Sequence, residues 1–399
     1  MTPAQEPMTE RETVVLAGVL LADAMEEAKA SDDFGLPLDV AMCLIDQQHA
    51  GGEPAGDPVR FLAQAAEVAR GQKWVPPWLY GGVARMGWLA AQMVERGLLS
   101  TRNSGRIDDF VIAWAERYPE FLDVDLPAGI LGLGVYGLAH PDRSIRETIS
   151  RIVLGVISER TDSDEHGIFV RRVNTSRAQA SPDYVIGDRD LGVAHGNMGV
   201  AAYLAFVRRS GLACADQALA LLTPLSRWLL SMAIPGGEND PVYGVVAERY
   251  PQPAHIAWCY GDPGSSVALS LIAGALDDGA LAERCRSTAS RAAAASLARQ
   301  ADPAGIADCT LCHGAAGLTY FGRKWSAERG LDGLGHARRW AGYIQRKRRA
   351  GRLSYPGLGE LAPNGSFLDG DCGVASALFY LVSDQPPLWE PLLLMAPPA

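Results

Sequence analysis

Gly314-Ala315-Ala316-Gly317 is one copy of a frame in which a short polar or aromatic turn leads into Gly-x-x-Gly and then an apolar helical run. The other copies are Gly82-Val83-Ala84-Arg85, Gly129-Ile130-Leu131-Gly132, Gly196-Asn197-Met198-Gly199, Gly261-Asp262-Pro263-Gly264 and Gly370-Asp371-Cys372-Gly373. Successive first glycines are 47, 67, 65, 53 and 56 residues apart. Each step is long enough for two helices and a loop, so the frame marks a repeated helix pair.

Amphipathic stretches with helical spacing lie between the frames, at residues 61–70, 145–159, 215–232, 281–299 and 335–349. Strand signals are confined to residues 167–170 and 242–246. A helix pair repeated in this way either stacks as an open solenoid or closes into a ring, and a solenoid favours more uniform repeats. We therefore predict an all-α fold, an α/α toroid with a double ring of inner and outer helices. The inner helices are expected to begin at the glycine frames.

The N-terminal region has a helical pattern over residues 11–30, which prolines and glycines interrupt between residues 37 and 58. We predict that residues 1–60 form a helical segment that is part of the ring or wraps it, and that residues 61–399 form the toroid. Arg85 replaces the second glycine of the first frame, and we expect it to cap the outer surface.

The composition excludes several classes of function. The 399 residues carry 36 basic and 46 acidic side chains, and the net charge of −10 argues against binding to nucleic acid or an anionic bilayer. No stretch approaches the roughly 20 apolar residues that a membrane span needs. The N-terminus does not resemble a signal peptide, which predicts a cytoplasmic location.

Cysteine and histidine residues occupy matching positions in two frames. Cys259 stands two residues before the first glycine of its frame, and Cys312 and His313 stand two and one residues before theirs. Taken one at a time, the two cysteines are explained as small buried residues and the histidine as a helix-capping residue. Their coincidence favours one open zinc site, because three soft or borderline ligands leave a coordination position for a substrate group. Cys309-x-x-Cys312 is also a redox spacing, but no thioredoxin-like strand and helix pattern follows it.

His195 stands one residue before Gly196, which is the position of His313 in its own frame. The two interpretations of such a histidine, a helix cap and an acid or base, both remain open. Asp125 precedes Gly129 by four residues in a turn before Pro127, where an aspartate is explained by the turn alone.

Several of these motifs resemble those of the LanC family of lanthionine cyclases. They are Ala194-His195-Gly196, Trp258-Cys259-Tyr260-Gly261 and Cys312-His313-Gly314, and the resemblance extends from about residue 79 to 381. It implies an α/α toroid with one Zn²⁺ ion bound by Cys259, Cys312 and His313. It also implies that His195 is the acid/base group and Asp125 its helper. The family typically has an arginine four residues before the first zinc cysteine, where this chain has His255. We therefore keep His255 as a second candidate proton donor.

The implied function is addition of peptide cysteine thiols to dehydroalanine or dehydrobutyrine, which closes (methyl)lanthionine rings in a lanthipeptide precursor, as in biosynthesis of antibiotic peptides. The implied partners are the dehydrated precursor with its leader, and also the dehydratase and an exporter. Two alternatives stay open: addition of glutathione to dehydrated peptides, and a non-catalytic, zinc-stabilised scaffold that binds peptides. The basic segment 338–352 is either a solvated helix face or a docking site for an acidic leader.

Overall fold

The computed structural model describes residues 8–101, 105–300, 306, 308–356 and 361–398. The helices are α1 (Glu10–Lys29), α2 (Gly35–His49), α3 (Pro58–Gly71), α4 (Val83–Glu95), α5 (Gly105–Ala115), α6 (Ile130–Leu138), α7 (Arg143–Glu159), α8 (Thr175–Ala180), α9 (Asn197–Arg209), α10 (Ala215–Ser231), α11 (Asp262–Ala273), α12 (Gly279–Arg299), α13 (Ala315–Arg329), α14 (Leu334–Arg349) and α15 (Asp371–Val382). Short 3₁₀ helices are η1 (Ala247–Arg249) and η3 (Glu390–Leu393). Strands β1 (Thr161–Asp164) and β2 (Gly167–Val170) form one antiparallel hairpin, and β3 (Tyr355–Pro356) pairs with β4 (Leu361–Ala362).

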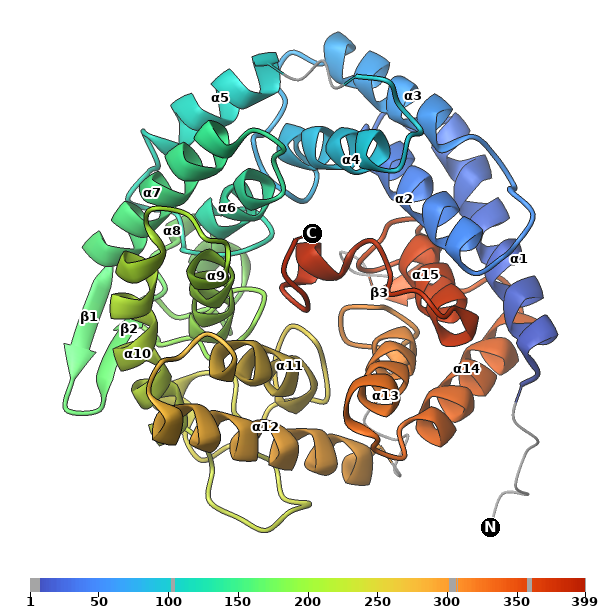
Figure 1. Cartoon of the computed structure of the whole chain (residues 1–399). Coiled ribbons are helices and arrows are strands. Elements are labelled where there is room, and N and C mark those ends of the chain that lie inside the picture. Colours follow the sequence, from blue (N-terminus) through green and yellow to red (C-terminus); the bar gives the residue numbers. More distant parts are fainter. Residues whose placement is uncertain (1–7, 102–104, 301–305, 307, 357–360, 399) are drawn as a thin grey trace. The chain divides into compact units, whose positions relative to one another are not determined.

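The chain divides into two compact units. Unit 1 comprises residues 1–72 and 297–389, and unit 2 comprises residues 73–296 and 390–399. In unit 2, α4, α6, α9 and α11 form one row, and α5, α7, α10 and α12 lie along one side of it (Figure 1). In unit 1, α13, α15 and α2 form a row, flanked by α14, α1 and α3 (Figure 1). Both units therefore consist of paired layers of helices.

The C-terminal segment completes the core of unit 2. Leu392, Leu393 and Leu394 are buried, and the first two are fixed through their carbonyl oxygens. Tyr80 Oη donates to Leu392 O over 2.8 Å, and Trp258 Nε1 donates to Leu393 O over 2.9 Å. The segment thus connects the loops that lead into α4 and α11.

Every glycine frame starts a helix, as the sequence predicts. The first glycines of the six frames are the N-caps of α4, α6, α9, α11, α13 and α15, which we call the frame helices. In four of them the first helical N–H donates over 2.8–3.1 Å to the carbonyl oxygen six residues before the glycine; these acceptors are Pro76, Asp190, Asp308 and Asn364. The loop before each of these helices is therefore folded back onto its first turn.

The second glycine of a frame is required by the same folding back of the loop. A Cβ atom at Gly199 would lie under 3.0 Å from Val193 O, and one at Gly264 would be equally close to Trp258 O. The same holds at Gly132, Gly317 and Gly373, each against the carbonyl three residues before its first glycine. A real Cβ cannot approach a carbonyl so closely, so these positions admit only glycine.

The first frame departs from this rule at Arg85, and our expectation of an outer-surface residue is wrong. Arg85 is 3% exposed, and its guanidinium lies over the Tyr80 ring, 5.4 Å from the centroid. The cation–π contact and the burial of the long side chain explain its place inside the helix layer.

The periodic stretches between the frames are helices whose ends lie within about three residues of the predicted ends, and residues 167–170 form β2. The prediction of a strand at residues 242–246 is wrong. Val242 N and Tyr243 N donate to the Asp262 carboxylate over 3.0 and 2.9 Å, so this segment caps α11 and has only an isolated bridge to Asp190. Pro37 was expected to interrupt the helical pattern, but it lies inside the helix α2. The proline lies in the first turn of α2, where a missing N–H is tolerated.

Across the residues that the structure describes, no helix combines the length and the apolarity needed to cross a membrane. In unit 1, part of the predicted basic segment is paired with α1. Arg348 Nη2 lies 2.8 Å from Asp23 Oδ2, and Arg352 Nη2 lies 3.1 Å from Glu27 Oε2.

The close approach of Gly199 to Val193 O predicts a large loss of stability in Gly199→Ala. Because the neighbour is backbone, the loop or the helix must shift, and we expect a loss of roughly 2–4 kcal/mol. Gly155→Ala is the matched control, since Gly155 is helical and a Cβ atom added there would meet nothing within 4 Å; it should gain up to about 1 kcal/mol. Urea unfolding of both variants measures the difference. Equal stability of the two variants would contradict the close-approach argument.

Candidate functional site

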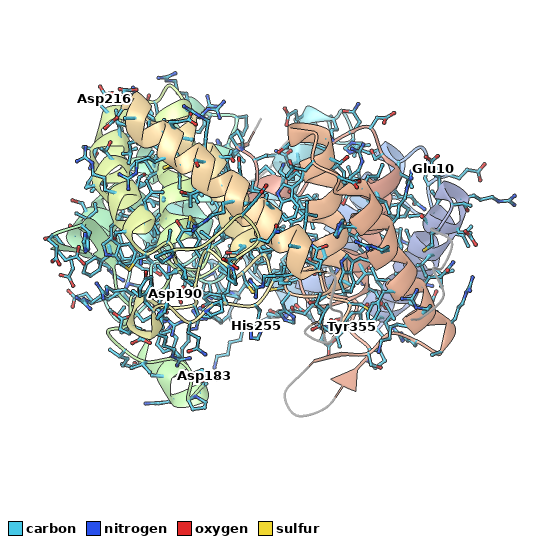
Figure 2. All side chains as sticks on the ribbon, turned by 90° about the horizontal axis from the view of Figure 1, so that it is seen from below. Glu10, Asp183, Asp190, Asp216, His255 and Tyr355 are labelled. Atoms are coloured by element: carbon cyan, nitrogen blue, oxygen red, sulfur yellow. The ribbon has the colours of Figure 1, made fainter. Side chains whose placement is uncertain are left out.

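The loops before the frame helices present the predicted site residues. Figure 2 shows Asp190 and His255, which begin the third and fourth frame loops, on the opposite side of unit 2 from Asp216 at the start of α10. Val193 N donates to Cys259 O over 2.9 Å, and Leu126 N donates to Ala194 O over 3.0 Å. Three neighbouring frame loops of unit 2 are therefore joined through their backbones, close to His195, Cys259 and Asp125.

His195 and Asp125 are in direct contact. His195 Nδ1 lies 2.8 Å from Asp125 Oδ2, the carboxylate is 6% exposed and the imidazole is 24% exposed. Asp125 Oδ1 also accepts from Ala128 N over 2.9 Å. The same side chain therefore stabilises the turn, as its position before Pro127 predicts, and contacts the histidine. Because Nδ1 is engaged by the carboxylate, Nε2 is the nitrogen that remains for proton transfer.

An ion pair and a tyrosine lie beside this histidine. Tyr260 is tilted against the His195 ring with centroids 6.1 Å apart, and its hydroxyl donates to Asp190 Oδ2 over 2.9 Å. The buried Arg172 contacts the same carboxylate with Nε at 2.9 Å and Nη2 at 2.5 Å. Burial, and next the Asp190 carboxylate, raise the pKa of Tyr260, which therefore stays a hydrogen-bond donor at neutral pH.

His255 and Cys259 are both in unit 2, but the structure does not bring the side chain of His255 into this network. His255 is exposed, and within the described ranges no hydrogen bond or ion pair involves its imidazole. Cys259 is half-buried. Nothing therefore links His255 to the His195–Asp125 pair.

In unit 1, Cys312, His313 and Asp369 offer one ligand atom each, all within 4.8 Å of one another. Leu311 N and Cys312 N both donate to Leu368 O over 3.1 Å, which holds the two frame loops together. Asp369 was not predicted. It occupies the position of His195 and His313, one residue before the first glycine of a frame, and this equivalence was the available signal.

The orientation of His313 is fixed by Asp308. His313 Nδ1 lies 3.0 Å from Asp308 Oδ2 and 3.1 Å from Thr310 Oγ1, whereas Nε2 faces Asp369 Oδ1 at 3.8 Å. Burial raises the pKa of Asp308, but hydrogen bonds from His313 and Thr310 outweigh burial and lower it overall. A carboxylate on one ring nitrogen is the usual support of a metal-binding histidine. The thiol, imidazole and carboxylate together fit Zn²⁺.

Cys309 does not join this cluster as a second ligand. It is 4% exposed, and burial together with the Asp308 carboxylate raises its pKa to about 12. The thiol is therefore protonated at neutral pH, which is unfavourable for metal binding and for thiol–disulfide exchange.

Comparisons with known proteins give two consistent findings and one that disagrees. The model of the family described as Lanthionine synthetase C-like protein matches residues 89–394. Among solved structures, nisin cyclase has a TM-score of 0.69 and 18% sequence identity, over 95% of this chain and 96% of that chain. The ribosomal RNA small subunit methyltransferase G of Salinispora tropica is 32% identical over 203 residues, which are 49% of this chain and 74% of that protein.

The fold decides between these matches. In the described residues the sheets are two-stranded and antiparallel, and the helices agree with the fold of nisin cyclase across nearly the whole chain. The net charge of −10 also disfavours an RNA substrate. The predicted all-α, α/α toroid class is confirmed by this agreement. With the family model matching residues 89–394, the chain belongs to the family of lanthionine synthetase C-like proteins.

Proposed function

We propose that this chain is a zinc-dependent cyclase that forms (methyl)lanthionine rings in a dehydrated lanthipeptide precursor. Within the family assigned above, the observation that carries the proposal is the Cys312–His313 cluster, in which Asp308 holds the histidine for metal binding. The scaffold alternative explains a metal site equally well. It gives no reason for the contact between His195 and Asp125.

We assign one Zn²⁺ ion to Cys259, Cys312 and His313. Cys312 and His313 are supported by their cluster in unit 1. Cys259 is supported by its equivalent position in its own frame and by the family resemblance. Asp369 adds a carboxylate close to the other two groups of unit 1.

When bound, zinc supplies the thiolate form of a peptide thiol whose pKa is otherwise about 8.5. In the reaction the sulfur forms a bond with the β-carbon of dehydroalanine or dehydrobutyrine, and the π electrons move to the α-carbon and its carbonyl. His195, as the imidazolium, then transfers a proton from Nε2 to the α-carbon, and the proton released by the thiol restores the imidazolium through solvent. Asp125 holds Nδ1 throughout.

His195 is the preferred donor over His255, because only His195 has an orienting carboxylate in the described structure. The dehydrated precursor with its leader is the proposed substrate, and the cytoplasm is the proposed location. The dehydratase and an exporter are proposed partners.

Zinc-loaded protein should consume thiols of a dehydrated peptide. A peptide that contains one cysteine and one dehydroalanine should lose its alkylatable thiol without a change of mass, because cyclisation is an isomerisation. Alkylation followed by mass spectrometry measures this, with chelator-treated protein as the control. A product heavier by one glutathione, formed only when glutathione is supplied, would favour the glutathione alternative. Unchanged alkylation across a panel of ring sizes would refute ring formation.

Metal binding and proton transfer should separate between two variants. Cys312→Ala should lose zinc, while His195→Asn should keep zinc and lose ring closure by about 10²–10⁴-fold. Cys214→Ala is the control, because Cys214 is a buried cysteine at the N-cap of α10. The helix α10 is not a frame helix, and Cys214 belongs to none of the frame loops that carry the proposed site residues. Zinc content by plasma mass spectrometry is the measurement. Zinc loss in His195→Asn would show that His195 is misassigned.

The support of His313 by Asp308 predicts weaker zinc binding in Asp308→Asn, by about 10–100-fold. The amide should preserve the loop, since Asn364 Oδ1 accepts from Ser366 N over 2.9 Å just as Asp308 Oδ1 accepts from Thr310 N over 2.7 Å. Chelator competition measures the affinity, and an unchanged thermal midpoint checks the fold. Unchanged zinc affinity would exclude a supporting role for this carboxylate.

A further inference from the structure

Arg177 reaches the His195–Asp125 pair from a connection that no sequence motif singled out. Its Nη1 lies 2.9 Å from Asp125 Oδ2, 3.5 Å from Asp123 Oδ2 and 3.2 Å from His195 Nδ1. The guanidinium lies 5.3 Å from the centroid of the Tyr184 ring, and the side chain is 33% exposed. One cation therefore contacts both buried carboxylates and the imidazole.

The backbone that carries Arg177 is anchored on Asp123. Val173 N and Asn174 N donate to Asp123 Oδ1 over 2.8 and 3.2 Å, and Tyr184 Oη donates to both oxygens of the same carboxylate. Asn174 Oδ1 in turn caps α8 by accepting from Arg177 N over 3.1 Å. Because Asp123 is two residues from Asp125, the position of α8 is tied to the loop that holds the acid of the pair.

The charges around the imidazole explain what Arg177 does there. Asp123 and Asp125 are each about 5% exposed, and two buried carboxylates need a permanent cation whenever His195 is neutral. Arg177 supplies that cation in both charge states of the imidazole. It thereby holds Asp125 Oδ2 beside Nδ1. Because the Asp125 carboxylate can only accept, its 2.8 Å contact with Nδ1 favours the Nδ1–H tautomer of neutral His195, and Arg177 then acts on the pair through Asp125.

We propose that Arg177 is a positioning residue of the cyclisation reaction, which fixes the tautomer and orientation of His195 through Asp125. This inference rests on the proposed function. Its consequence is that the proton reaches the α-carbon from one face only. Without the guanidinium, Asp125 loses its cation and no longer holds Nδ1 in one position. The ring samples other orientations, and solvent protonates the enolate from either face.

Arg177→Gln tests the proposal, with Arg177→Lys as the conservative variant and Arg171→Gln as the matched control. Arg171 lies in the same connection and pairs with Asp162 at 2.6 Å, away from His195. We expect Arg177→Gln to keep zinc and to remain folded, with a lower thermal midpoint than the wild type because Asp123 and Asp125 lose their cation. Its kcat should fall about 100-fold with KM within about twofold, and its lanthionine should be a mixture of α-carbon epimers by chiral gas chromatography. Arg177→Lys should recover about tenfold in kcat, since the charge returns without the planar fork.

A wild-type kcat with a single epimer in Arg177→Gln would overturn the proposal. A higher KM with an unchanged kcat would also overturn it, because Arg177 would then be a peptide-binding residue. If Arg177→Gln does not fold, the same criteria apply to Arg177→Lys.

A second measurement, independent of activity, separates this inference from the proposed function. It is a set of long-range ¹⁵N spectra of the seven histidines. At pH above 8, His195 should be a single Nδ1–H tautomer in the wild type and in Arg171→Gln, and a mixture in Arg177→Gln. An unchanged tautomer would reject the positioning role even if cyclisation is confirmed. Absence of cyclisation with the expected tautomer change would reject only the proposed reaction.

Discussion

The site depends on one steric constraint, the contact between the second glycine of a frame and a backbone carbonyl in the loop before the helix, which is present in five of the six frames. Because no side chain fits at Gly199, Gly264 or Gly317, the loop is folded back onto the first helical turn. The residue before the N-cap glycine then lies directly before the first helical turn in each of these copies. His195, Tyr260, His313 and Asp369 all occupy this position. The backbone supplies the geometry, and only the side chain decides between proton transfer, hydrogen bonding and metal binding.

Three of these groups are in contact with a carboxylate from a frame loop. Asp125 contacts His195, Asp190 contacts Tyr260, and Asp308 contacts His313. Burying carboxylates is costly unless they are paired, so each acid needs its own donors. Arg172 forms an ion pair with Asp190, and Arg177 forms ion pairs with Asp123 and Asp125. Arginine therefore lies beside the buried acids that contact Tyr260 and His195.

Local periodicity predicted most of the fold, because a helix and its N-cap are determined within a few residues. The frames indicated every frame helix, and the amphipathic stretches indicated most of their partners. The failures have long-range causes. Residues 242–246 look like a strand, but the side chain that binds their N–H groups is Asp262, about twenty residues away. Asp369 could have been found from its position one residue before the first glycine of a frame. It was missed because only cysteine and histidine were considered as metal ligands. No local signal indicates Arg177, because its reach depends on how Asp123 anchors α8.

Cys309 and Cys312 show how geometry separates two residues that a sequence spacing joins. A Cys-x-x-Cys pair predicts either a dithiol or two ligands of one ion. Here Thr310 N donates to Asp308, so the chain turns between the cysteines. Burial of Cys309, and next the Asp308 carboxylate, raise the pKa of its thiol and keep it protonated. Cys312 stays half-buried, two residues before the N-cap of α13, where the positive end of the helix favours a thiolate. The same aspartate orients His313. Burial together with this carboxylate therefore makes Cys309 unsuited to a metal, and the same carboxylate contacts the imidazole beside Cys312.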